Sequence, residues 1–187
     1  MMRLLIVDDN KENLYILRLL LEANGHEVVS ATNGAEALEA ARRDPPDMII
    51  ADILMPVMDG FQLCRAVKKD SELKNILFVF YTASYTDVKD EELAMEVGGD
   101  CFVRKPVEAE ELLETIQCVV RDVESGKTKP RERQDKEEAE MLQLYSQRLV
   151  QKLQKKMMNL EREVAEREKA QEELRKSNER FRLVVQA

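Results

Sequence analysis

The chain has 187 residues, which is enough for one ordinary domain and an additional segment. Its 37 acidic and 29 basic residues give a net charge of -8, which argues against a general nucleic-acid-binding protein. The three cysteines have no CxxC spacing, the N-terminus has no signal-peptide pattern, and no uncharged stretch reaches membrane-spanning length, which together predict a cytoplasmic protein with free thiols.

Short apolar runs alternate with segments of helical periodicity over residues 1–124. The predicted strands are residues 4–7, 28–31, 48–51, 76–81 and 101–103. Apolar residues recur at helical spacing within residues 14–21, 35–39, 61–67, 93–97 and 112–123. Asn10 and Asn33 stand where helix N-caps are expected, and Pro106 fits the first turn of the fifth helix. Near-continuous apolar strands predict a five-stranded parallel sheet covered on both faces, which is a doubly wound α/β domain.

In a doubly wound domain the ligand site lies at the carboxyl ends of the strands. The residues that the strands of this chain deliver there include Asp8, Asp9, Asp52, Thr82 and Lys105. Three converging carboxylates repel one another unless a cation holds them together, and a few carboxylates without a full protein cage suit Mg²⁺. We expect Lys105 to pair with a phosphoryl group and the Thr82 hydroxyl to donate a hydrogen bond to it.

Four short motifs lie in order on successive predicted strands. They are VDDN at residues 7–10, DILMPVMDG at 52–60, TA at 82–83 and KP at 105–106. Together they resemble the receiver domain of two-component response regulators, whose fold is flavodoxin-like. The resemblance covers residues 1–124, and it implies that Asp52 accepts a phosphoryl group from a histidine kinase or a phosphotransfer protein.

The same resemblance implies roles for the other residues at the site. Asp9 and Asp52 would bind Mg²⁺ through their side chains, Asp8 through water, and Leu54 through its backbone carbonyl. Lys105 would neutralise the phosphoryl oxygens, and a cis bond would precede Pro106. Thr82 and Phe102 would form the switch, although Phe102 lacks the hydroxyl of the tyrosine often found at its position. The chain would then be no conventional enzyme, since it would catalyse only its own phosphorylation and dephosphorylation.

The same residues also fit other interpretations. Asp8 and Asp9 alone fit an N-cap pair, Thr82 a buried strand hydroxyl, and Phe102 an ordinary core residue. A haloacid-dehalogenase-type phosphatase needs a second aspartate two residues after the nucleophile, where this chain has Leu54. A dinucleotide-binding domain needs a glycine-rich turn after the first strand, which is absent.

The composition changes after residue 124. Residues 125–134 form a polar linker, and residues 135–187 contain neither glycine nor proline, which predicts one long helix. Its apolar seam has heptad spacing and consists of Val150, Leu153, Met157, Leu160 and Val164. We expect this helix to form a parallel homodimeric coiled coil, with folding back onto the receiver as the alternative. Interleaved acidic residues argue against DNA binding. Residues 174–185 resemble the start of a PAS domain.

The sequence therefore predicts a phospho-accepting response regulator in which Asp52 controls the C-terminal helix and any module that follows it. Two alternatives remain open. One is a docking or dimerisation scaffold that works without phosphorylation. The other is the receiver fragment of a larger PAS-containing sensor kinase.

Overall fold

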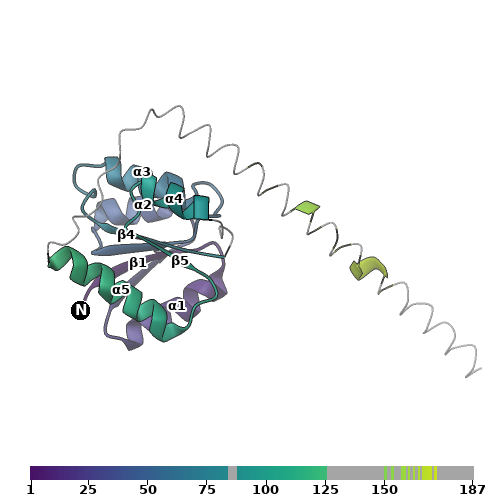
Figure 1. The fold of residues 1–187 in the computed structure, drawn as a ribbon, viewed down its shortest axis with the longest axis horizontal. Helices are drawn as coiled ribbons and strands as arrows, with labels where there is room; N and C mark the ends of the chain where they lie inside the picture. Colours follow the sequence, from purple (N-terminus) through teal and green to yellow (C-terminus); the bar gives the residue numbers. More distant parts are fainter. Residues whose placement is uncertain are drawn as a thin grey trace, which may run out of the picture. The chain divides into compact units, whose positions relative to one another are not determined.

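Five parallel strands form a central sheet (Figure 1). Their bounds are β1 Arg3–Val7, β2 Glu27–Ala31, β3 Met48–Ala51, β4 Leu77–Thr82 and β5 Cys101–Arg104. The strand order is β2-β1-β3-β4-β5, so β1 and β3 are neighbours although they are not consecutive in the chain. The predicted five-stranded parallel sheet is confirmed, and β4 begins and ends one residue later than the predicted range of 76–81.

The computed structural model describes residues 1–83 and 88–125, together with separate positions between 150 and 171. The chain divides into two units, Met1–Gln134 and Asp135–Ala187. In the second unit, each described position is helical and exposed. Most of the predicted linker and long helix, including the PAS-like segment, lies outside the described residues. Within the described ranges, no helix has both the length and the apolarity needed to span a membrane.

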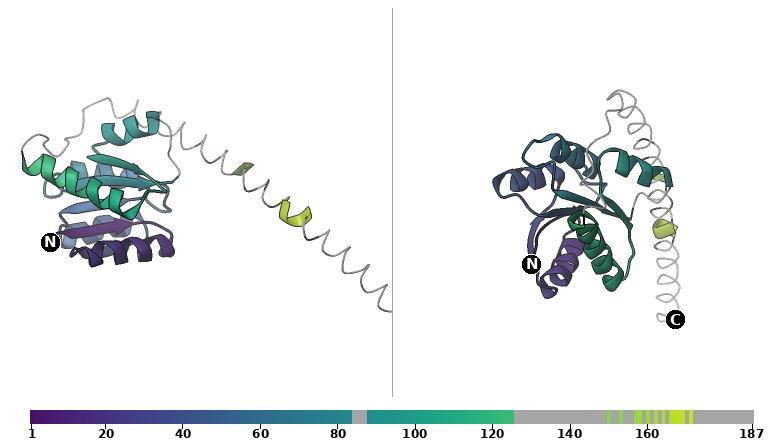
Figure 2. Two further views of the ribbon diagram at one scale, coloured as in Figure 1. Left: turned by 60° about the horizontal axis from the view of Figure 1, so that its bottom comes forward. Right: turned by 60° about the vertical axis from the view of Figure 1, so that its left-hand side comes forward.

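Five helices cover the two faces of the sheet. Their bounds are α1 Lys11–Ala23, α2 Gly34–Arg43, α3 Gly60–Lys69, α4 Val88–Glu96 and α5 Ala109–Glu124. Helices α1 and α5 lie on one face, and α2, α3 and α4 lie on the other, as Figures 1 and 2 show. The predicted caps are confirmed, since the side chains of Asn10 and Asn33 accept hydrogen bonds from the backbone N–H groups of Glu12 and Glu36 at 2.8 and 3.0 Å.

The prediction that Pro106 lies in the first turn of the fifth helix is wrong. Helix α5 begins at Ala109, and its N-cap is Glu108. The backbone of Glu108 is extended (φ −66°, ψ 147°), so the helix cannot begin before it. Pro106 therefore belongs to the connection between β5 and α5. The cis peptide bond between Lys105 and Pro106 that the family resemblance implied is present.

Phenylalanine rings fill the space between the sheet and α3. Phe61 of α3 and Phe78 and Phe80 of β4 are all fully buried. The ring centroid of Phe80 lies 4.9 Å from that of Phe78 and 5.3 Å from that of Phe61, with the rings tilted against one another. Large buried aromatic side chains contribute much of the packing energy of a core. They fix the strand that carries Thr82 at its carboxyl end.

A buried ion pair joins α3 to the amino ends of β4 and β5. The ammonium of Lys68 lies 2.9 Å from a carboxylate oxygen of Asp100 and donates a hydrogen bond of 2.9 Å to the carbonyl of Ile76. The same Asp100 oxygen accepts a hydrogen bond of 2.8 Å from the backbone N–H of Phe78. The Lys68 side chain is 1% exposed and the Asp100 side chain 6% exposed. Because water hardly reaches either group, each charge is neutralised mainly by the other.

Replacing Lys68 by methionine should therefore destabilise the fold strongly. The variant leaves the Asp100 carboxylate buried without its cation, which typically costs about 3–5 kcal/mol. The exposed Lys74 provides a matched control, because Lys74→Met removes the same charge at the surface and should change stability by less than about 0.5 kcal/mol. Urea denaturation followed by circular dichroism measures both variants, and equal midpoints would contradict the importance of the buried pair.

Candidate functional site

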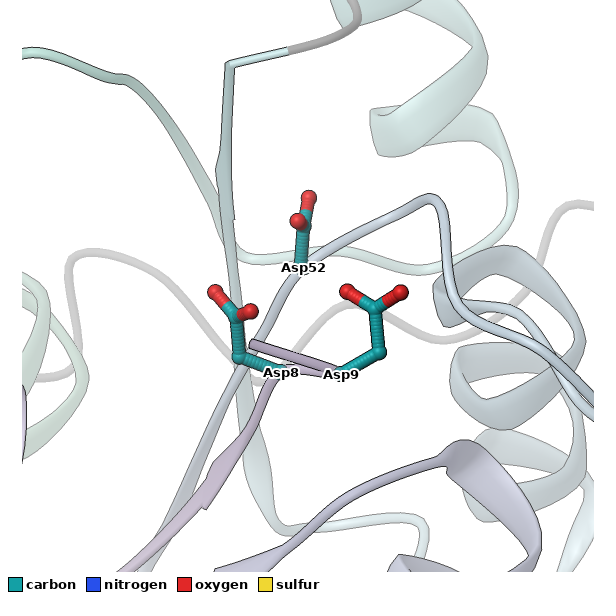
Figure 3. Close-up of side chains that lie close together, drawn as sticks. All are labelled: Asp8, Asp9 and Asp52. Carbon is teal, nitrogen blue, oxygen red and sulfur yellow. The ribbon is translucent and has the colours of Figure 1, made fainter. Parts of the chain in front are cut away.

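Three carboxylates meet where β1 and β3 end. One oxygen from each of Asp8, Asp9 and Asp52 lies within 4.8 Å of the other two, and Figure 3 shows the three side chains together at the strand ends. The backbone N–H of Asp52 donates a hydrogen bond of 2.8 Å to the carbonyl of Val7, which keeps the two strand ends in register. Asp8 is buried, Asp52 is half-buried and Asp9 is exposed. The structure thus brings the three predicted acidic ligands together.

Asp8 is the most tightly held member of this acidic cluster. One of its carboxylate oxygens lies 2.5 Å from the ammonium of Lys105. The side-chain amide of Asn13 donates to both oxygens, at 3.1 and 3.2 Å, and the backbone N–H of Asn10 donates to Oδ1 at 2.8 Å. Hydrogen bonds to a charged group are comparatively strong, and several of them together restrict the side chain to one position. Asp8 is therefore fixed as a buried acceptor at the base of the site.

Asp52 lies in a less compensated position. Its carboxylate is 3.9 Å from the Lys105 ammonium and accepts a hydrogen bond of 2.7 Å from the backbone N–H of Ile53. Burial raises the pKa of the Asp52 carboxyl, and Lys105 and a hydrogen bond with Thr82 oppose that rise. The charge of Asp8 adds to the rise. Asp52 therefore combines a side chain that is 12% exposed with a charge that Lys105 only partly offsets, which suits a group that reacts with an electrophile.

Lys105 reaches the acidic cluster from the end of β5. Its backbone N–H donates a hydrogen bond of 2.8 Å to the carbonyl of Thr82, so the β4–β5 pairing sets its position. Its ammonium also lies 4.6 Å from the ring centroid of Tyr81. The structure thus brings the predicted cation close to Asp8 and Asp52.

Thr82 and Phe102 lie on one face of the sheet, at neighbouring strands. Thr82 ends β4 and is fully buried. Phe102 pairs in register with Phe80 and is half-buried, with the two ring centroids 6.5 Å apart. Because side chains two residues apart on a strand share a face, Thr82, Phe80 and Phe102 belong to the same side of the sheet. The guanidinium of Arg104 lies 5.8 Å from the Phe102 ring centroid and forms an ion pair of 2.9 Å with Glu91 of α4.

The loop after β3 carries Leu54, whose carbonyl stays a predicted metal ligand. The loop is pinned at both ends by backbone hydrogen bonds of 2.9 Å, from Gly34 to the carbonyl of Met58 and from Gly60 to the carbonyl of Ile53. A Cβ atom on Gly60 would collide with the carbonyl oxygen of Asp52. Glycine at this position therefore allows α3 to begin directly beneath the acidic cluster.

Two residues that contact the site were not singled out from the sequence. Asn13 holds Asp8, and Tyr81 holds Lys105. The N-cap at Asn10 places Asn13 in the first turn of α1, close to the end of β1, which could have indicated the first contact. Tyr81 directly precedes Thr82, and strand alternation sends it to the opposite face of the sheet.

Comparison with known proteins agrees with this geometry. Residues 4–117 match the model of the response regulator receiver domain. The chain belongs to the receiver domain family. PilH of Pseudomonas aeruginosa is 38% identical over 120 residues, which are 64% of this chain and 98% of PilH. These matches cover the receiver only, so the coiled coil and the PAS-like start of the C-terminal segment stay predictions.

Solved receiver structures share the fold. Chemotaxis response regulator CheY4 of Vibrio cholerae matches with a TM-score of 0.60 and 35% identity, over 64% of this chain and 98% of CheY4. The receiver domain of the sensor histidine kinase PA1611 of P. aeruginosa, which has a magnesium ion coordinated in its active-site cleft, matches with a TM-score of 0.59 and 25% identity. That match covers 64% of this chain and 98% of the PA1611 domain.

Replacing Asp52 by asparagine should raise the free energy of unfolding of this receiver at pH 7 in EDTA. Because burial raises the pKa of Asp52 above its ordinary value of 3.8, the folded state favours the neutral carboxyl. The stability that the neutral form contributes is complete below pH 3.8 and is lost as the pH rises through the folded pKa. The amide does not ionise, so the variant keeps this stability at pH 7, and its advantage should vanish at pH 3.

The control is Asp44→Asn, which removes the same charge from an exposed residue. It should give no gain in stability at pH 7. Urea denaturation at the two pH values measures all three proteins. An Asp52→Asn variant that is less stable than the wild type at pH 7 in EDTA would contradict the prediction.

Proposed function

We propose that this receiver accepts a phosphoryl group on Asp52 from a histidine kinase or a phosphotransfer protein, in a Mg²⁺-dependent reaction in the cytoplasm. The observation that carries the proposal is the acidic cluster of Asp8, Asp9 and Asp52 with the Lys105 ammonium beside it. The three carboxylates exceed the positive charge that Lys105 supplies. A divalent cation fits this excess, and a phosphoryl group can then bind beside the cation.

The residues present fit a magnesium ion. Oxygen ligands from carboxylates are what Mg²⁺ prefers, and a site with few protein ligands leaves positions for water and for phosphoryl oxygens. In the proposed arrangement Asp9 and Asp52 bind the ion directly, Asp8 binds through water, and Leu54 offers its backbone carbonyl. The magnesium ion coordinated in the active-site cleft of the PA1611 receiver supports the choice of metal. When bound, the ion supplies positive charge to the phosphoryl oxygens.

Asp52 provides the nucleophile. One carboxylate oxygen attacks the phosphorus in line, a new O–P bond forms, and the bond to the donor atom breaks with its electron pair leaving on the donor. The product is an acyl phosphate, which water later cleaves to inorganic phosphate and the free carboxylate. Lys105, 3.9 Å from Asp52, neutralises charge on the transferred oxygens, so the protein contributes mainly positioning and electrostatics.

Phosphorylation would bias a two-state surface through Thr82 and Phe102. The new phosphoryl oxygens are strong hydrogen-bond acceptors. The buried Thr82 side chain already forms a hydrogen bond with Asp52, so it is close enough to respond to them. Movement of Thr82 toward the phosphoryl group frees space on the face of the sheet that it shares with Phe102. Phe102 is half-buried and can move further inward, which would alter the surface formed by α4, β5 and α5.

Mass spectrometry tests the proposed chemistry directly. The full chain, incubated with Mg²⁺ and acetyl phosphate, should gain the mass of one phosphoryl group, and Asp52→Asn should gain none. Omission of Mg²⁺ should suppress the adduct, because the repulsion within the acidic cluster is then uncompensated. A wild-type chain that gains no phosphate, or an Asp52→Asn variant that does, would favour the alternative in which the receiver is a docking or dimerisation scaffold.

We further propose that the C-terminal segment pairs two chains and passes the change in the receiver to any module that follows. Its described apolar residues Val150, Leu153, Met157, Leu160 and Val164 have heptad spacing and are between 49% and 60% exposed. An exposed apolar seam of this kind gains stability by packing against a second helix. The receiver of PA1611 belongs to a sensor histidine kinase, which keeps the alternative of a sensor-kinase fragment open.

The proposed pairing predicts the mass of the chain in solution. The wild type should sediment as a dimer, and the double variant Leu153→Lys/Leu160→Lys should sediment as a monomer, because it places charges in the seam. Lysine has a high helix propensity, so the substitutions do not by themselves break a helix. Met158→Lys is the matched control, since Met158 is 69% exposed but lies outside the heptad seam. A monomeric wild type, or a monomeric Met158 variant, would contradict the proposed seam.

A further inference from the structure

The Lys105 ammonium is held by an aromatic ring as well as by carboxylates. It lies 4.6 Å from the ring centroid of Tyr81, 2.5 Å from an oxygen of Asp8 and 3.9 Å from an oxygen of Asp52. The Lys105 side chain is 14% exposed, so these contacts are largely withdrawn from water. A cation over an aromatic face is attracted by the quadrupole of the ring, and more strongly when it is desolvated.

The backbone places Tyr81 for this contact. Tyr81 is the residue before the end of β4 and pairs in register with Val103 of β5. Its side chain packs against the apolar cluster beneath α1 and α5, on the face of the sheet opposite to Thr82. The hydrogen bond from the Lys105 N–H to the Thr82 carbonyl holds the start of the lysine side chain beside this ring.

The kind of contact matters for a group that has to move. During phosphoryl transfer the ammonium of Lys105 has to pass from Asp8 toward oxygens bound to Asp52. A hydrogen-bond acceptor in place of Tyr81 would fix one N–H bond of the ammonium at a set distance and angle. The face of a ring attracts a cation without such a fixed geometry. The ring can therefore limit the many rotamers of the lysine while leaving its ammonium free to exchange partners.

We propose that Tyr81 is a positioning residue for phosphoryl transfer, whose ring keeps the Lys105 ammonium between Asp8 and Asp52. The role rests on the proposed function. Tyr81 is half-buried, and it also lines a groove of about 300 Å³ with Asn13, Ile16 and Pro106. A residue that served packing alone would affect stability, but it would not act through Lys105.

The test compares ring-bearing and ringless variants of the full chain. With Mg²⁺ and acetyl phosphate, Tyr81→Leu should form the phosphate adduct about two- to tenfold more slowly than the wild type, which is the range expected for one cation–π contact. Tyr81→Phe keeps the ring and should react within about twofold of the wild type, because the hydroxyl contributes little to the attraction. Tyr81→Met provides a second ringless variant if the leucine variant folds poorly.

A double-mutant cycle shows whether Tyr81 acts through Lys105. In a Lys105→Met background, Tyr81→Leu should have no further effect on the rate, whereas independent roles would give multiplicative losses. A measurement that needs no phosphorylation completes the test. In spectra of lysine-labelled protein without Mg²⁺ or phosphodonor, the ε-methylene protons of Lys105 should be shifted upfield by the ring in the wild type and in Tyr81→Phe. That shift should be lost in Tyr81→Leu.

The outcomes separate the two proposals. A normal wild-type adduct together with an unchanged rate for Tyr81→Leu, or multiplicative losses in the cycle, would overturn the positioning role and leave the proposed function in place. A wild-type chain without any adduct would overturn the proposed function and, with it, the role of Tyr81.

Discussion

The ammonium of Lys105 lies between carboxylates that come from two different strands, Asp8 at the end of β1 and Asp52 at the end of β3. Two carboxylates this close repel each other in a partly buried site unless a cation lies between or beside them. The lysine in turn is placed by the hydrogen bond between its backbone and Thr82, which extends the β4–β5 pairing. The charge balance of the site therefore depends on the pairing of β4 with β5. A change in the pairing of β5 would move the cation away from both carboxylates.

Much of this site could be predicted because parallel strands bring their carboxyl ends to one edge whatever surrounds them. That rule grouped Asp8 and Asp52, and local capping chemistry located Asn10. The position of Pro106 was predicted wrongly, because a preference for the first turn of a helix says nothing about how long the preceding connection has to be. The contact of Tyr81 with Lys105 could not be predicted, since it joins residues of different strands and requires the conformations of both side chains. Strand alternation assigns Tyr81 to a face of the sheet but not to a partner.

The loop after β3 shows how backbone constraints support the acidic cluster. Gly60 packs so closely beneath Asp52 that any larger residue would push the strand end aside. Val57 has φ 68°, a left-handed conformation that costs an L-residue about 1–2 kcal/mol, and its side chain is 84% exposed. Packing of that side chain therefore cannot offset the cost. The hydrogen bond from Gly34 to the carbonyl of Met58 holds the loop in this conformation, so α2 helps to shape a site to which it contributes no side chain.

Strand β4 contributes side chains to both faces of the sheet. Tyr81 points to the side of α1 and α5 and contacts the cation of the site, whereas Thr82 belongs to the side of Phe102. The buried rings of Phe78 and Phe80 hold the strand itself in place, so a displacement of Thr82 does not need to disturb the backbone beneath Tyr81. Under the proposed function, positioning of the phosphoryl group and response to it would fall to consecutive side chains on opposite faces. A strand held by buried rings would then allow Thr82 to change position without displacing the backbone that carries Tyr81.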